Sequence, residues 1–138
     1  MDVYRSVNSA DEDELVFVLS NQRDVDPEEV LRKRAAMRGI HIARLNEAGV
    51  FPSGAGYWVC RLDLACRFDE MLAEWHQNPT RILRLIEHGV RGLIEIHDAG
   101  RFHGDLRAGN IWVRINNDGS EEAFLVGMAL DYWQNLDT

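Results

Sequence analysis

The stretch FHGDLRAGNIWVR, residues 102–114, decides how this chain is interpreted. It places a histidine, an aspartate and an asparagine within eight positions, at His103, Asp105 and Asn110. A long apolar segment with helical spacing precedes it, and an alternating run typical of a β-strand follows it. The stretch is therefore either a catalytic loop or a turn in which Asp105 and Asn110 only cap backbone groups.

Length and composition predict one globular domain over residues 1–138, with 46% hydrophobic residues and a net charge of −8. The acidic balance argues against a nucleic-acid partner, and no apolar run is long enough for a membrane span. The acidic N-terminus does not resemble a signal peptide. Cys60 and Cys66 are expected to be reduced thiols without a zinc site, and the expected compartment is cytoplasmic.

Hydrophobic periodicity predicts an α+β fold. Strand patterns cover residues 13–21 and a hairpin over 50–65, and a second hairpin joins 110–115 to 122–130 around the turn 116–120. A helix begins after the cap Asp26, is interrupted at Gly39 and stops at Gly49. Shorter and longer helices are expected at 68–77 and 79–99, with Gly100 ending the latter.

This order of elements, together with HGDLRAGNI at 103–111, resembles the protein-kinase-like superfamily, and the match covers roughly residues 13–133. The resemblance implies a partial, truncated kinase-like fold with a reduced N-lobe sheet and one main helix. A hinge, a long helix and the catalytic-loop hairpin of the C-lobe would follow. Residues from about 1 to 62 would correspond to the N-lobe and those from about 63 to 138 to part of the C-lobe.

The resemblance also implies roles for single residues. Asp105 would be the catalytic base, Arg107 would steady the transferred phosphate, and His103 would shape the loop. Asn110 would be a magnesium ligand, and Gly127 would be the glycine of the family's Asp-Phe-Gly motif. An active protein of this kind would use ATP and magnesium.

Several features that the family needs for this chemistry are missing. Leu125 occupies the expected position of the metal-binding aspartate, and the lysine of the nucleotide-gripping strand is absent from 18–20. The chain's single lysine is Lys33, inside the predicted helix, so Glu28 and Glu29 are expected to be solvated. About a dozen residues precede the first predicted strand, too few for a glycine-rich loop between two strands. The stretch SGAG at 53–56 is interpreted as a hairpin turn.

These losses favour a kinase-like pseudoenzyme, a pseudokinase that acts as a binding or regulatory module in the cytoplasm or as an effector secreted into a host cytosol. No cofactor is then expected. The alternative is a minimal, atypical ATP-dependent phosphotransferase, a protein or small-molecule kinase that uses the HGDLRAGN loop.

The apolar residues of the 79–99 helix extend most of the way round it, from Ile82 to Ile96 and including Leu85. One hairpin cannot cover such a stripe, so we expect a protein partner or a homodimer there. The four tryptophans, Trp133 among them, are expected in the core or an interface. Histidines other than His103 are expected on surfaces or helix faces.

Overall fold

The computed structural model describes residues 2–19, 26–62, 65–75 and 78–128. Within these ranges the helices are α1 (Pro27–Ala36), α2 (Phe68–Trp75) and α3 (Pro79–Asp98). A four-stranded antiparallel sheet has the order β1-β2-β4-β3, formed by β1 (Asp2–Val7), β2 (Asp13–Val18), β4 (Gly56–Arg61) and β3 (Glu47–Val50). A three-stranded sheet has the order β5-β6-β7, formed by β5 (Cys66–Arg67), β6 (Ile111–Ile115) and β7 (Glu121–Leu125). The α+β prediction is confirmed.

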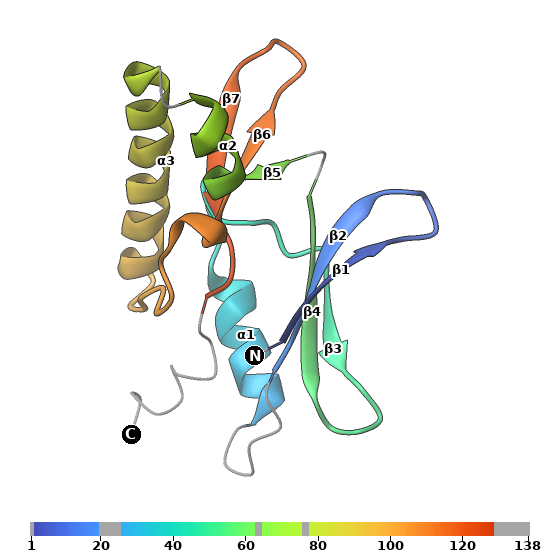
Figure 1. Ribbon diagram of the computed structural model, residues 1–138. Helices are drawn as coiled ribbons and strands as arrows, with labels where there is room; N and C mark the ends of the chain where they lie inside the picture. The colour runs from blue at the N-terminus through green and yellow to red at the C-terminus, as the bar shows by residue number, and fades with distance from the viewer. Residues whose placement is uncertain (1, 20–25, 63–64, 76–77, 129–138) are drawn as a thin grey trace.

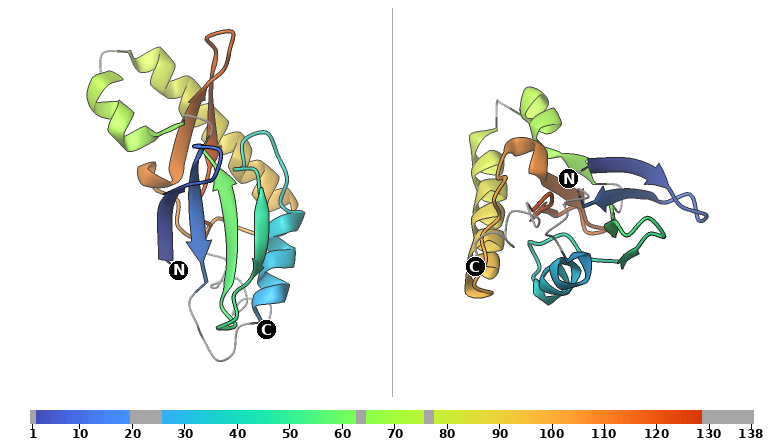
Figure 2. Two further views of the ribbon diagram at one scale, coloured as in Figure 1. Left: turned by 90° about the vertical axis from the view of Figure 1, so that its right-hand side faces the viewer. Right: turned by 90° about the horizontal axis from the view of Figure 1, so that it is seen from below.

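The two sheets occupy different parts of the molecule (Figure 1). Helix α1 packs beside the four-stranded sheet, while α2 and α3 lie beside the three-stranded sheet, and the two further views agree (Figure 2). The first sheet uses residues up to Arg61 and the second begins at Cys66, but the division of the chain into lobe-like parts near residue 62 stays a prediction. No helix in the described ranges is long and apolar enough to cross a membrane.

The long helix and the hairpin after the loop are confirmed. Asn78 caps α3 by accepting a hydrogen bond from the backbone N–H of Arg81, and Pro79 occupies the first turn. Gly100, just beyond the helix, has φ = +74°, a conformation that favours glycine. The stretch 53–56 forms the turn of the β3–β4 hairpin, also as predicted.

The predicted continuation of the first helix to Gly49 is wrong. Helix α1 ends at Ala36, and Gly49 lies in β3. Between them, Ile42 forms an isolated parallel bridge with Leu125, and Leu125 exchanges backbone hydrogen bonds of 2.9 Å with the segment at His41 and Ala43. This pairing with β7 satisfies the backbone and buries Ile42, so it replaces a helix that Gly39 already disfavours.

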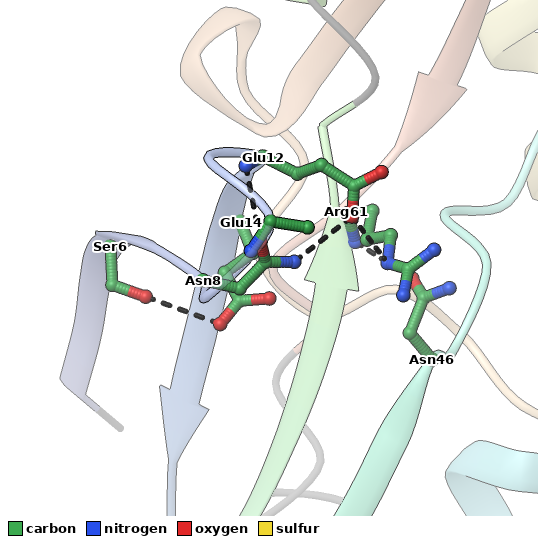
Figure 3. Close-up of polar contacts among 7 residues, drawn as sticks. Ser6, Asn8, Glu12, Glu14, Asn46 and Arg61 are labelled. Carbon is green, nitrogen blue, oxygen red and sulfur yellow. Dashed lines mark hydrogen bonds and ion pairs between the residues drawn. The ribbon is translucent and has the colours of Figure 1, made fainter.

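The sequence prediction missed β1, which pairs with β2 through a turn held by side chains (Figure 3). Asn8 Oδ1 accepts hydrogen bonds from the backbone N–H groups of Ala10 and Glu12, and Asn8 Nδ2 donates to the Glu12 carboxylate at 3.0 Å. Arg61 of β4 lies 3.4 Å from that carboxylate and donates its backbone N–H to Asn46 Oδ1. The edge strand is thus connected to the centre of the sheet at its turn.

The core is centred on apolar side chains of both sheets, and Phe17 stacks on Trp58 with ring centroids 5.0 Å apart. Trp58 and Trp112 are buried, as predicted, while Trp133 lies outside the described residues. His41 is buried, so its predicted surface position is wrong.

The apolar stripe of α3 is divided between two environments. Leu85 and Ile96 are buried against the rest of the chain, as are Gly89 and Gly92. Exposed side chains remain on the opposite face, with these exposed fractions: Leu83 64%, Ile86 43%, Val90 49% and Ile94 53%. Part of the stripe is therefore uncovered within the described chain, as the sequence predicted, although Leu85 and Ile96 do not belong to that part.

Candidate functional site

The loop between α3 and β6 is built around a buried histidine. His103 is 2% exposed, and its Nε2 lies 2.7 Å from the carbonyl oxygen of Val126, which follows β7. Its Nδ1 accepts a hydrogen bond from the backbone N–H of Asp105 at 3.1 Å. Nδ1 therefore carries no proton and Nε2 donates, which fixes one neutral tautomer. Burial lowers the pKa of His103, in agreement with a neutral ring.

The structure brings Asp105, Arg107 and Asn110 together on this loop. Asn110 Nδ2 donates to the backbone carbonyl of Asp105 at 2.8 Å and to its carboxylate Oδ2 at 3.1 Å. Arg107 Nε lies 3.5 Å from the same carboxylate oxygen, on an exposed surface. The Asp105 carboxylate is thus accessible and oriented by two donors. This geometry suits a base that accepts a proton from a bound hydroxyl and also suits a capped turn.

Gly127 lies directly against Asn110. Its φ is +69°, and a methyl group added to it would lie 2.5 Å from Asn110 Oδ1. Both its backbone conformation and the space available therefore require glycine at this position. The close approach fixes the orientation of the Asn110 amide beside the segment that follows β7.

The side chain beside Asn110 in the loop cavity belongs to Val126, one residue after Leu125, which the sequence analysis placed at the position of the metal-binding aspartate. Val126 lines this cavity together with Asn110, and its backbone N–H donates to the Asn110 carbonyl at 2.9 Å. Leu125 points the other way and contacts Gly92 of α3. The residue beside Asn110 where an aspartate was expected is therefore Val126 and not Leu125, and it too is aliphatic.

A cavity of about 300 Å³ separates the loop from the four-stranded sheet. Its apolar lining comes mainly from Leu15, Phe17, Trp112 and Val126. Its charged lining consists of three arginines and one glutamate, and each has an opposite charge nearby: Arg5 (Asp13, 3.0 Å), Arg67 (Glu70, 3.4 Å) and Arg107 (Asp105, 3.5 Å). The guanidinium of Arg5 also lies 6.0 Å from the centre of the Trp112 ring.

The residues beside Asn110 do not fit a magnesium ion. Magnesium demands an octahedral set of oxygen ligands, usually with one or two carboxylates. Asn110 offers one amide oxygen and its cavity neighbour Val126 offers none, while the carboxylate of Asp105 beside Asn110 is already occupied by the Asn110 amide and by Arg107. In the part of the chain that the structure describes, no group of three or more His, Cys, Asp or Glu side chains is placed to hold a metal ion.

The two described positions where a nucleotide-gripping lysine was expected, Val18 and Leu19, are also apolar. Leu19 is buried in the core, Val18 ends β2, and residue 20 lies outside the described residues. Lys33 lies on α1, 3.6 Å from Glu29 of the same helix, and lines a different cavity.

Arg34 is a buried charged side chain on α1, and the sequence analysis did not single it out. It donates to the carbonyl of Ala43 at 2.6 Å and lies 3.8 Å from the thiol of Cys60. Burial lowers the pKa of Arg34 and raises the pKa of Cys60. Arg34 therefore joins α1 to the segment that follows it and to β4, and does not reach the loop.

A pair of histidines joins the segment after α1 to the three-stranded sheet. The rings of His41 and His88 stack with centroids 4.6 Å apart. His41 Nδ1 lies 3.0 Å from the Ala123 carbonyl oxygen, and His88 Nδ1 accepts from the Ala123 N–H at 3.1 Å. No sequence pattern indicated this pair, because the two residues are 47 positions apart and meet only through β7.

A larger cavity, about 470 Å³, lies beside residues 35–45 and away from the loop. Its lining contains Arg38 and Arg44 and no acidic or nucleophilic side chain among the residues that the structure describes there. The loop cavity is therefore the better candidate site, although it is smaller.

Comparison with known proteins agrees with this architecture. No protein-family model matches the sequence, and no curated protein matches it. Among solved structures, the chain is similar to the kinase domain of maize sucrose-induced receptor kinase 1 bound to AMP-PNP, with a TM-score of 0.72 and 14% identity. The alignment covers 93% of this chain and 47% of that one, so the chain spans about half of the kinase domain that it matches. The chain therefore has a partial protein-kinase-like fold.

Proposed function

We propose that this chain is a kinase-like pseudoenzyme, a pseudokinase that works as a binding or regulatory module. The observation that carries the proposal is the lining of the loop cavity, where Val126, Leu15 and Phe17 stand beside Asn110. Phosphoryl transfer depends mostly on positioned charges around the phosphates and their metal ion. These aliphatic and aromatic side chains supply neither a metal ligand nor a cation, and the charged residues of the lining are already paired with one another or with nearby carboxylates.

The arginines of the cavity do not replace the missing lysine in this proposal. Arg5 is paired with Asp13, Arg67 with Glu70, and Arg107 with Asp105. A phosphate group would have to compete with these carboxylates. On this view Asp105 and Asn110 hold the loop together, since Asn110 donates to both the backbone and the side chain of Asp105.

The alternative is a minimal ATP-dependent phosphotransferase, and one observation favours it. The exposed Asp105 carboxylate is oriented by Asn110 and Arg107 in an arrangement compatible with general-base chemistry. The solved kinase domain with a similar fold was bound to AMP-PNP, which makes ATP with magnesium the cofactor pair to test.

A phosphotransfer assay with radiolabelled ATP and magnesium separates the two proposals. The substrates would be generic acceptor peptides and small hydroxyl compounds, and the proteins would be wild type, Asp105→Asn and the surface control Asp98→Asn. The pseudoenzyme proposal predicts equal background counts for all three. Label transfer by wild type and Asp98→Asn that disappears in Asp105→Asn would contradict it and support the phosphotransferase.

A further inference from the structure

The exposed face of α3 carries a continuous apolar stripe. Leu83, Ile86, Val90 and Ile94 follow one another at spacings of three or four residues, and each is at least 43% exposed. The opposite face of the helix packs on β7, so the stripe points away from the described chain, at the outer edge of the molecule (Figure 1). Contiguous apolar surfaces of a few hundred Å² usually mark an interaction site.

Charged side chains of alternating sign line one edge of this stripe. In chain order they are Arg84, Glu87, Arg91 and Asp98, and all are exposed. Glu87 and Arg91 form an i,i+4 ion pair of 3.0 Å, and both side chains are about 60% exposed, so each has room for a second partner. The order of signs along this edge is therefore plus, minus, plus, minus.

We propose that a second copy of this chain covers the stripe, with its α3 antiparallel to the first. A twofold axis near residues 88 and 89 places Leu83 opposite the partner's Ile94 and Ile86 near the partner's Val90. The charged edges then lie on the same side, so Glu87 faces the partner's Arg91 and Arg91 faces the partner's Glu87. A parallel arrangement would place the two charged edges on opposite sides of the interface and would lose these pairs, which disfavours it.

This interface is small. Four apolar side chains per copy and their charged edge fall at the low end of interface sizes, where complexes are weak. We therefore expect a dissociation constant in the micromolar range. This inference rests on the proposed function in one respect, since the second copy would be the partner of the proposed binding module. The phosphotransfer assay tests the cavity, whereas the next experiment tests only α3, so the failure of one is distinguishable from the failure of the other.

The test is a charge swap read by sedimentation equilibrium over a concentration series. Glu87→Arg alone places two arginines at each contact, and Arg91→Glu alone places two glutamates there. Each variant should weaken self-association by about tenfold or more, because two symmetry-related contacts change from attraction to repulsion. An equal mixture of the two variants should recover association, since each mixed contact again pairs opposite charges. Glu28→Arg and Arg32→Glu, exposed on α1, are charge-matched controls and should associate like wild type.

Val90→Asp tests the apolar part of the same interface and should abolish association while leaving the far-ultraviolet circular dichroism spectrum unchanged. A wild-type chain that stays monomeric to millimolar concentration overturns the proposal, and some other occupant would then cover α3. Association that the Glu87 and Arg91 variants leave unchanged, or that their mixture fails to restore, overturns it as well.

Discussion

Replacing His103 with leucine should destabilise the fold more than the same replacement of an exposed histidine. The ring of His103 is 2% exposed and bonds to backbone groups on both sides, to Val126 O at 2.7 Å and to Asp105 N at 3.1 Å. Leucine fills a similar volume and offers neither a donor nor an acceptor. A buried backbone group left without its partner costs about 1–3 kcal/mol, so two such losses give about 2–6 kcal/mol. This is a large part of the free energy of unfolding of an average domain.

Urea denaturation at pH 8, followed by circular dichroism, measures this change. Burial lowers the pKa of His103, so its ring is neutral at this pH and its replacement removes no charge. The control is His97→Leu, at the exposed end of α3, which should change the free energy of unfolding by less than about 0.5 kcal/mol. A His103→Leu variant that unfolds at the same urea concentration as this control would refute the argument that His103 holds the loop to Val126.

Three further predictions follow from the site. Gly127→Ala should lower the free energy of unfolding by about 1–2 kcal/mol because alanine disfavours the left-handed backbone, and by a further amount because the new methyl group collides with Asn110. Gly119 has a similar backbone conformation and open space around it, so Gly119→Ala should show only the cost of the backbone. Equal losses for the two variants in thermal unfolding would contradict the collision with Asn110. Burial lowers the pKa of His103 below its ordinary value of 6.5, so the unfolded chain takes up a proton first. The contribution of His103 to the free energy of unfolding should be fully present above about pH 6.5 and be lost as the pH falls through the lower pKa of the folded state. In a pH titration of the urea midpoint, His103→Leu should remove this decrease. Val126→Asp should lower the melting temperature, and magnesium should restore part of that loss. Magnesium should not restore the melting temperature of Leu125→Asp, because of these two residues only Val126 lines the cavity beside Asn110. Equal magnesium responses of the two variants would refute the placement of Val126 beside Asn110.

The sequence was most informative where local chemistry decides the structure. Asn78 and Pro79 start α3 and Gly100 follows its end, so the bounds of this helix could be predicted closely. The hairpin after the loop was predictable because its apolar residues alternate around a polar turn. The loop HGDLRAGN indicated both the kinase-like fold and the site, since His103, Asp105 and Asn110 do meet there.

Long-range pairing decides the parts that were not predicted. The segment 37–46 contains apolar residues at helical spacing, but Ile42 pairs with Leu125, more than 80 positions away, and no local signal marks that partner. Strand β1 is short and largely exposed, and among the described strands it pairs only with β2. The one-residue difference between Leu125 and Val126 has the same origin, because the contact with Gly92 of α3 determines which side chain leaves the cavity. Spacing in the sequence cannot give that orientation.

Nucleotide binding is the measurement that tests the central claim, a kinase-like fold whose cavity no longer serves phosphoryl transfer. The melting temperature of the wild-type chain would be recorded with millimolar ATP, with and without magnesium, and with tripolyphosphate as a control for anion binding to the arginines. A ligand at a hundred times its dissociation constant adds about 2.7 kcal/mol, a shift of several degrees in a domain of this size. The account predicts no magnesium-dependent shift beyond that of tripolyphosphate. A shift of several degrees that requires both ATP and magnesium would contradict it.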